Sequence, residues 1–182
     1  FALSCPAGSE VAVIHVNGWA TPGDVYAWDL VAGRATTVWA SNLAGLDPAG
    51  LVRPLSLRTK ARDGVELQGL LYLPKAARNG GDAPPVVFDV HGGPTLQALA
   101  DYRGYVQYLV NRGIAVFRPN VRGSRGFGHR YTTLDDRERR LDSIRDLVDL
   151  LAYLRSDGRV DASRAAVRGD SYGGYAVNAA LS

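Results

Sequence analysis

Short apolar runs separated by turn-forming residues mark the first 45 positions of the chain. The runs lie at residues 11–16, 25–30 and 35–39, and Gly, Pro, Asn and Asp occur between them. Apolar segments of this length, bounded by such residues, are typical of β-strands joined by tight turns. We therefore expect a meander of three or four strands. It is either one blade of a β-propeller or a small antiparallel appendage to the next domain, and the spacing alone favours neither.

Beyond residue 54 the pattern changes to strands that alternate with helices. Apolar runs predict strands at 85–90, 114–119 and 164–169, and amphipathic patterns predict helices at 101–113 and around 141–154. In the second helix, apolar residues three and four positions apart share one face; they are Leu141, Ile144, Leu147, Val148, Leu151 and Leu154. Such alternation predicts an α/β fold with parallel strands and helices on both faces of the sheet.

Composition and charge exclude several classes of partner. The 182 residues are 46% hydrophobic and 21% charged, with a formal net charge of +3. The one Arg-dense run, residues 135–146, interleaves acids with bases, so we expect no nucleic-acid partner. No apolar run approaches the roughly 18 residues that a membrane span needs, so we expect no membrane partner.

Cysteine and histidine usage gives no sign of a metal or a redox framework. Cys5 is the single cysteine, which rules out an intrachain disulfide and mildly favours a reducing, cytoplasmic location. The three histidines, His15, His91 and His129, lack the short spacings of zinc ligands. We expect no metal and no cofactor.

The stretch "GDSYG", residues 169–173, places a serine between glycines directly after an apolar strand. At a sharp strand-to-helix turn a nucleophilic serine takes a strained backbone conformation, and side chains two residues away would collide with the neighbouring strand and helix. Glycines remove that collision. The pattern predicts Ser171 as a nucleophile whose neighbour, Tyr172, offers a backbone N–H to an oxyanion. The alternative is a glycine-rich structural turn.

The second candidate segment is "DVHGGPT", residues 89–95, at the end of an earlier strand. Acyl transfer needs a second oxyanion donor from such a loop, and Gly92 and Gly93 would let its backbone approach the reacting carbonyl. The alternative is a simple turn. His91 could be taken for the general base, but in this architecture the acid and the histidine follow the nucleophile in sequence. No histidine follows Ser171, so we expect the chain to be part of a longer protein.

Four segments in this order resemble the serine peptidases of the prolyl oligopeptidase family: "HGGPT", "GIAVFRPNVRGSRGFG", "SIRDLVDLLAYL" and "GDSYGGYAV". The form "HGGP" is most similar to the acylaminoacyl-peptidase-like branch. The resemblance implies that residues 1–50 are the end of a β-propeller. Residues 51–182 would be the N-terminal half of an α/β-hydrolase domain, incomplete because it ends after the nucleophile elbow.

The resemblance also implies an activity, the hydrolysis of short peptides through an acyl-enzyme on Ser171. Other branches place a tyrosine near the oxyanion loop; here His91 occupies that position, so the donors would be the N–H groups of Tyr172 and Gly93. Arg122 and the loop up to Gly128 would support the site. Peptides would be the substrate partners, and the protein can form a homo-oligomer.

The implied acid and base would lie beyond this sequence, so we expect the 182-residue chain alone to be inactive. Two alternatives remain open at this point. One is an esterase or lipase of the α/β-hydrolase class, which also uses an HGG-type loop. The other is a non-catalytic interaction module.

Overall fold

The computed structural model describes residues 1–181, which divide into two compact units. Unit 1 consists of residues 1–53 together with 100–107, and unit 2 consists of residues 54–99 together with the chain from 108 onward. The division lies close to the predicted boundary after residue 50. None of the described helices is both long and apolar enough to cross a membrane.

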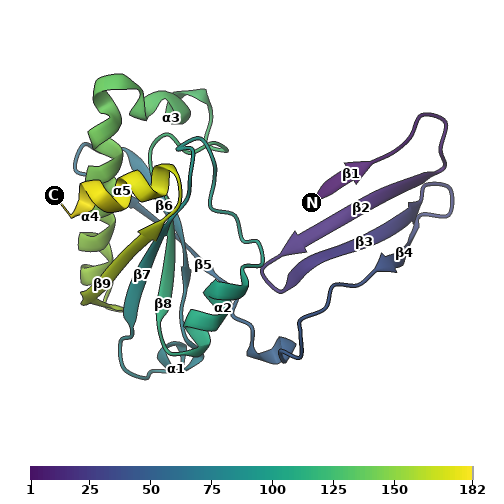
Figure 1. Cartoon of the computed structure of the whole chain (residues 1–182), viewed down its shortest axis with the longest axis horizontal. Helices are drawn as coiled ribbons and strands as arrows, with labels where there is room; N and C mark the ends of the chain where they lie inside the picture. Colours follow the sequence, from purple (N-terminus) through teal and green to yellow (C-terminus); the bar gives the residue numbers. More distant parts are fainter. Residues whose placement is uncertain (182) are drawn as a thin grey trace. The chain divides into compact units, whose positions relative to one another are not determined.

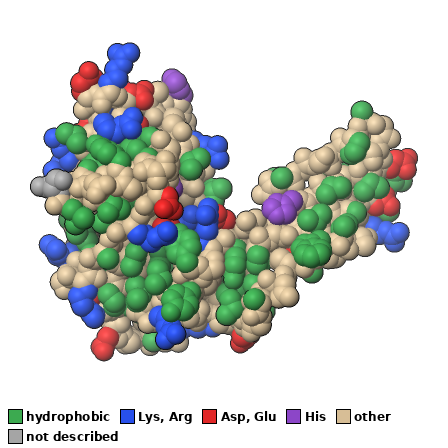
Figure 2. All heavy atoms as spheres, in the orientation of Figure 1, with side chains coloured by type: hydrophobic (Ala, Val, Ile, Leu, Met, Phe, Trp, Pro, Cys, Tyr) green, Lys and Arg blue, Asp and Glu red, His purple; other side chains and the backbone are tan. Residues whose placement is uncertain are grey.

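Unit 1 contains an antiparallel sheet of four strands in sequence order (Figure 1): β1 (Ala2–Ser4), β2 (Val11–Gly18), β3 (Thr21–Asp29) and β4 (Arg34–Trp39). The β3–β4 turn is closed by Asp29, whose carboxylate accepts the N–H groups of Val31 and Ala32. Only Ala12 is buried in these strands, and Trp39 is 63% exposed. Hydrophobic side chains accordingly lie on the surface of this sheet (Figure 2).

Residues 100–107 join unit 1 through polar contacts. The Gln107 side chain, 2% exposed, accepts the N–H of Val52 at 2.8 Å and donates to the Val52 carbonyl at 3.0 Å. The Tyr102 N–H donates to the side-chain oxygen of Asn17 at 3.0 Å. These bonds link positions more than 50 residues apart, which explains why the sequence pattern gave no sign of this grouping.

Unit 2 contains a five-stranded sheet in the order β5-β6-β8-β7-β9, with bounds β5 (Leu55–Lys60), β6 (Glu66–Tyr72), β7 (Pro85–Val90), β8 (Ala115–Asn120) and β9 (Asp161–Gly169). Strand β7 pairs parallel with β8 and β9, as the alternation of strands and helices predicts. The β5–β6 hairpin adds antiparallel pairs, one of them between β6 and β8. Strand β9 begins three residues earlier than the predicted 164–169.

The helices are α1 (Lys75–Arg78), α2 (Gly104–Asn111), α3 (His129–Thr132), α4 (Arg140–Asp157) and α5 (Tyr172–Ala180), with short 3-10 turns at Pro48–Gly50, Thr133–Asp135 and Arg137–Arg139. Helices α4 and α5 pack against the sheet of unit 2 (Figure 1). Every residue of the central strand β8 is buried. A Cβ on Gly69 would lie 2.2 Å from the Phe117 ring, so glycine in β6 leaves the space that this core aromatic fills.

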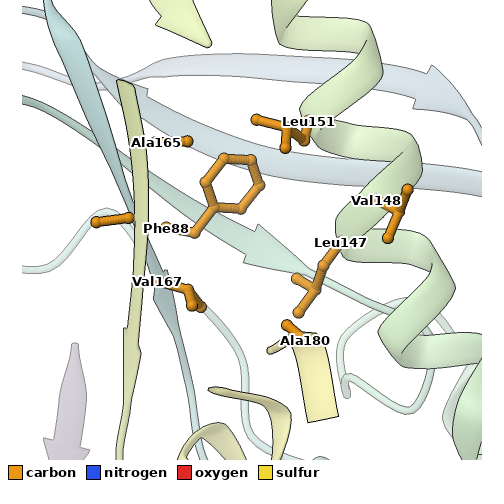
Figure 3. Close-up of a pocket in the computed structure, with 8 residues that line it drawn as sticks. Phe88, Leu147, Val148, Leu151, Ala165, Val167 and Ala180 are labelled. Atoms are coloured by element: carbon orange, nitrogen blue, oxygen red, sulfur yellow. The ribbon is translucent and has the colours of Figure 1, made fainter. Parts of the chain in front are cut away.

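The predicted apolar face of α4 is only partly buried. Ile144, Leu147 and Leu154 lie in the core, whereas Leu141 and Val148 are 53% and 54% exposed. Val148 borders an open apolar groove of about 220 Å³ beside β9 (Figure 3). The groove is lined by Phe88, Leu147, Val148, Leu151, Ala165, Ala166, Val167 and Ala180. Strand β9 is the last strand of this sheet within the described chain, and its residues 163–166 are exposed.

Candidate active site

Ser171 lies at the sharp turn between β9 and α5. Strand β9 ends at Gly169, helix α5 begins at Tyr172, and Ser171 itself is exposed with φ 56° and ψ −119°. Positive φ is rare for a residue with a side chain and costs on the order of 1–3 kcal/mol. The turn has the strand, elbow and helix order that the sequence predicts, with the serine at its most strained position.

Two glycines make this turn sterically feasible. A Cβ on Gly173 would lie 2.1 Å from the Val90 carbonyl oxygen, and a Cβ on Gly169 would lie 2.5 Å from the carbonyl carbon of Gly173. Both distances are far below van der Waals contact. The start of α5 therefore approaches β7 and β9 more closely than any side chain at these two positions would allow.

The loop after β7, residues 91–96, comes next to Ser171; we call it the HGGP loop. Strands β7 and β9 are parallel neighbours, and Val90 pairs with Gly169, so their carboxyl ends meet at one edge of the sheet. A Cβ on Gly92 would lie 3.5 Å from the Cβ of Ser171. The following residue, Gly93, is exposed and has φ 115°, a conformation that favours glycine.

Two backbone N–H groups near Ser171 are free to receive a ligand. In the described part of the chain, neither the Gly93 N–H nor the Tyr172 N–H donates to another protein group. Tyr172 is the first residue of α5, where an N–H has no partner inside the helix and the helix dipole favours negative charge. The two predicted donors thus lack a protein acceptor in the described part of the chain.

The Tyr172 side chain contacts helix α4. Its hydroxyl donates to the hydroxyl of Ser143 on α4, which in turn donates to the Arg140 carbonyl at 2.7 Å. The Arg140 guanidinium lies 5.3 Å from the centre of the Tyr172 ring. Burial raises the pKa of the phenol. The ring therefore fastens the start of α5 to α4, which keeps the elbow in place.

His91 is part of the HGGP loop and makes no hydrogen bond to Ser171. Its Nδ1 lies 2.8 Å from the Gly92 carbonyl oxygen, and its Nε2 lies 2.9 Å from the hydroxyl of Ser124. Burial lowers the pKa of the imidazole, although the bond to Gly92 opposes this. Among the residues that the structure describes, no histidine is hydrogen-bonded to the Ser171 side chain.

A buried carboxylate beneath the site was not singled out by the sequence analysis. Asp89, 7% exposed, lies 2.6 Å from a guanidinium nitrogen of Arg168 and 3.3 Å from Nε of Arg118. These residues come from the adjacent strands β7, β9 and β8. The contacts hold together the strand ends that carry the site. The available signal was one charged residue within each of the apolar runs of β7 and β8, Asp89 and Arg118.

Arg122 anchors the loop that follows β8. Its guanidinium contacts Asp146 on α4 and Asp63 of the β5–β6 turn, both at 2.7 Å. Burial alone would lower the pKa of Arg122, but these carboxylates hold the pKa above its ordinary value. The backbone N–H of Arg122 also donates to Asp146. The described residues 1–181 contain no group of three His, Cys, Asp or Glu that could hold a metal ion.

Comparison with known proteins identifies peptidases as relatives. A model of the prolyl oligopeptidase family matches residues 100–182. The chain is 37% identical to dipeptidyl aminopeptidase BIII of Pseudoxanthomonas mexicana, over 84% of this chain and 23% of the relative. It is 30% identical to acylamino-acid-releasing enzyme 2 of Oryza sativa subsp. japonica, over 50% of this chain and 12% of that protein. The chain spans about a quarter or less of the length of these curated relatives.

Solved structures agree with the sequence relatives. A puromycin hydrolase superimposes with a TM-score of 0.86 at 30% identity, covering 99% of this chain and 27% of the other. An acylaminoacyl peptidase of Pyrococcus horikoshii gives 0.80 at 25% identity, covering 100% and 28%. These neighbours confirm the predicted fold class, the first part of an α/β-hydrolase fold preceded by strands from the end of a β-propeller.

Proposed function

Because this chain belongs to the prolyl oligopeptidase family, we propose that the whole protein is a serine peptidase with Ser171 as its nucleophile. One observation carries the proposal. Ser171 takes a strained, exposed conformation at the end of β9, and the Gly92 position is so close that a Cβ there would lie 3.5 Å from the Ser171 Cβ. Strain at an exposed serine beside a glycine loop is the arrangement that presents a hydroxyl to a substrate carbonyl.

In this mechanism Ser171 Oγ attacks the scissile carbonyl and the carbonyl oxygen becomes negatively charged. The N–H groups of Gly93 and Tyr172 donate to that oxygen, and the amine product leaves as an acyl-enzyme forms. Water then releases the acid product. The Ser171 proton passes to a histidine that the rest of the protein supplies, and this histidine gives it to the nitrogen of the leaving amine. This assignment follows because His91 is already engaged with Gly92 and Ser124.

Short peptides are the proposed substrates, in keeping with the peptidases that the chain resembles. We propose the domain division of the sequence analysis, with residues 1–50 at the end of a propeller and the hydrolase domain from residue 51. A complete propeller would restrict access to small peptides. A cytoplasmic location and homo-oligomerisation also remain predictions, which cell fractionation and light scattering of the whole protein would test.

The test is covalent labelling of the whole protein with a fluorophosphonate, followed by mapping of the modified residue. We expect the label on Ser171, and we expect Ser171→Ala to abolish both labelling and turnover of a peptide anilide. Ser156→Ala is the matched control, because this exposed serine caps only its own helix through the Tyr153 carbonyl.

Three results would speak against the proposal. An unlabelled Ser171 in the folded whole protein would support a non-catalytic module instead. Turnover of a p-nitrophenyl ester without any turnover of peptides would support an esterase. Robust turnover by the 182-residue chain alone, dependent on Ser171, would show that the base lies within this chain.

A further inference from the structure

The Gly92–Gly93 peptide unit links the proposed oxyanion donor to the His91 side chain. Its carbonyl oxygen belongs to Gly92 and lies 2.8 Å from His91 Nδ1, whereas its N–H belongs to Gly93. A trans peptide is planar, so its N–H points opposite to its carbonyl. The only cis bond near this position in the described chain is the next one, Gly93–Pro94. A contact that fixes the orientation of the Gly92 carbonyl therefore also fixes the direction of the Gly93 N–H.

We propose that His91 and Ser124 are positioning residues that lock this peptide unit in the orientation catalysis needs. This inference rests on the proposed function, because it concerns how the oxyanion donor is held. Glycine on both sides leaves the peptide unusually free to rotate. Without a side-chain bond the unit could turn, and its N–H would then point away from the reacting carbonyl.

The hydrogen atoms around His91 can be assigned from the acceptors. The Gly92 carbonyl can only accept, so His91 Nδ1 carries the proton of that bond. His91 Nε2 lies 2.9 Å from the Ser124 hydroxyl oxygen, and this hydroxyl donates its one proton to the Val121 carbonyl at 2.6 Å. The Ser124 oxygen is thereby fixed in place. The imidazole ring is held between this oxygen and the Gly92 carbonyl.

Ser124 is itself held rigidly, so its contact with His91 fixes the position of the imidazole ring. Its side chain is fully buried. The preceding Arg122 is fastened to Asp146 on α4 through both its backbone N–H and its guanidinium. The following Arg125 donates its N–H to the Leu96 carbonyl of the HGGP loop at 3.1 Å. The loop after β8 therefore supports the HGGP loop through the contacts of Ser124 with His91 and of Arg125 with Leu96.

Matched variants of His91 separate the two bonds that its ring makes. In His91→Asn the side-chain amide can still donate to the Gly92 carbonyl, but it cannot reach Ser124. In His91→Gln the amide can reach Ser124, but it has no donor at the Nδ1 position. We expect His91→Gln to lower kcat and the rate of fluorophosphonate labelling about 100-fold, the usual effect of losing one oxyanion donor. His91→Asn should keep both within about tenfold of the wild type, and KM should change less than threefold in either variant.

Ser124→Ala tests the second bond. We expect about a tenfold loss of kcat in the whole protein, with the fold retained by circular dichroism and a melting temperature lowered only modestly by the loss of the buried hydroxyl. In the His91→Asn background the same substitution should cause no further loss, because the contact between Nε2 and Ser124 is already gone. Equal activity of His91→Asn and His91→Gln, or full additivity of Ser124→Ala with His91→Asn, would overturn the inference while leaving Ser171 as the nucleophile. Absence of any label on wild-type Ser171 would overturn both proposals.

Discussion

At the scale of single residues, the strained conformation of Ser171 is predictable from its neighbours in the sequence. Glycines two positions on either side predict the strained turn, and the φ of 56° agrees with it. The role of His91 could not be predicted in this way. Its bonds depend on where the Gly92 carbonyl and the Ser124 hydroxyl come together, and Ser124 is 33 positions away in sequence.

Backbone strain at position 171 should be measurable as a difference in the free energy of unfolding between two variants. Glycine adopts positive φ without steric cost, although it also increases the entropy of the unfolded chain. We expect Ser171→Gly to raise the free energy of unfolding by about 1 kcal/mol relative to Ser171→Ala, which keeps a Cβ and hence the strain.

The measurement should follow unit 2, which contains this turn. The three tryptophans, Trp19, Trp28 and Trp39, all lie in unit 1, so their fluorescence does not report on the turn. Urea unfolding followed by helical circular dichroism is the suitable probe, because α3, α4 and α5 lie in unit 2. Equal stability of the two variants would mean that the backbone at 171 is relaxed.

At the scale of elements, the packing of α5 on the sheet depends on one of two adjacent glycines. A Cβ on Gly173 would meet the Val90 carbonyl at 2.1 Å, whereas a Cβ on Gly174 would meet nothing closer than 3.6 Å. The spacing of two residues from Ser171 already marks Gly173 as the position that needs glycine. The approach of the Val90 carbonyl to the helix gives the reason.

Alanine substitutions at the two glycines should therefore differ in sign. We expect Gly173→Ala to destabilise unit 2 by about 2–3 kcal/mol through overpacking and to abolish fluorophosphonate labelling of the whole protein. Gly174→Ala should be neutral or stabilise by up to about 1 kcal/mol, because alanine is the better helix former. Similar losses in both variants, measured by thermal unfolding, would contradict the close approach.

Helix α4 illustrates why an apolar pattern predicts the presence of a helix better than it predicts which residues of that helix are buried. The three- and four-residue spacing predicts the helix, but Asp146 and Ser143 are among its most buried residues. They are buried because Arg122 and Tyr172 bond to them. Those partners lie in other segments, so the pattern within α4 could not reveal them.

At the scale of the whole molecule, the apolar groove beside β9 leaves apolar side chains of the sheet and of α4 open to solvent. A free strand edge and an adjacent apolar surface both favour association between chains. We expect the 182-residue chain to bind a hydrophobic dye such as ANS and to self-associate at high concentration.

Two charge substitutions on α4 test whether the groove causes the dye binding and the self-association. Val148→Lys should reduce dye binding severalfold, because Val148 lines the groove. Leu141→Lys should leave dye binding unchanged, since Leu141 is equally exposed on the same helix but lies outside the groove. Light scattering should show the same ranking for self-association. An equal effect of both substitutions would assign the association to surface charge in general.

The strand order of unit 2 has a consequence for synthesis on the ribosome. Strand β8 lies between β6 and β7 in the sheet, yet both neighbours are translated before it. Until Asn120 has emerged, β7 has no partner in this sheet and β6 pairs only with β5. At 5–20 residues per second, translation of residues 91–120 takes roughly 2–6 s. Codon choice and chaperone occupancy over this stretch should therefore influence the yield of folded protein more than they do after β8 is complete.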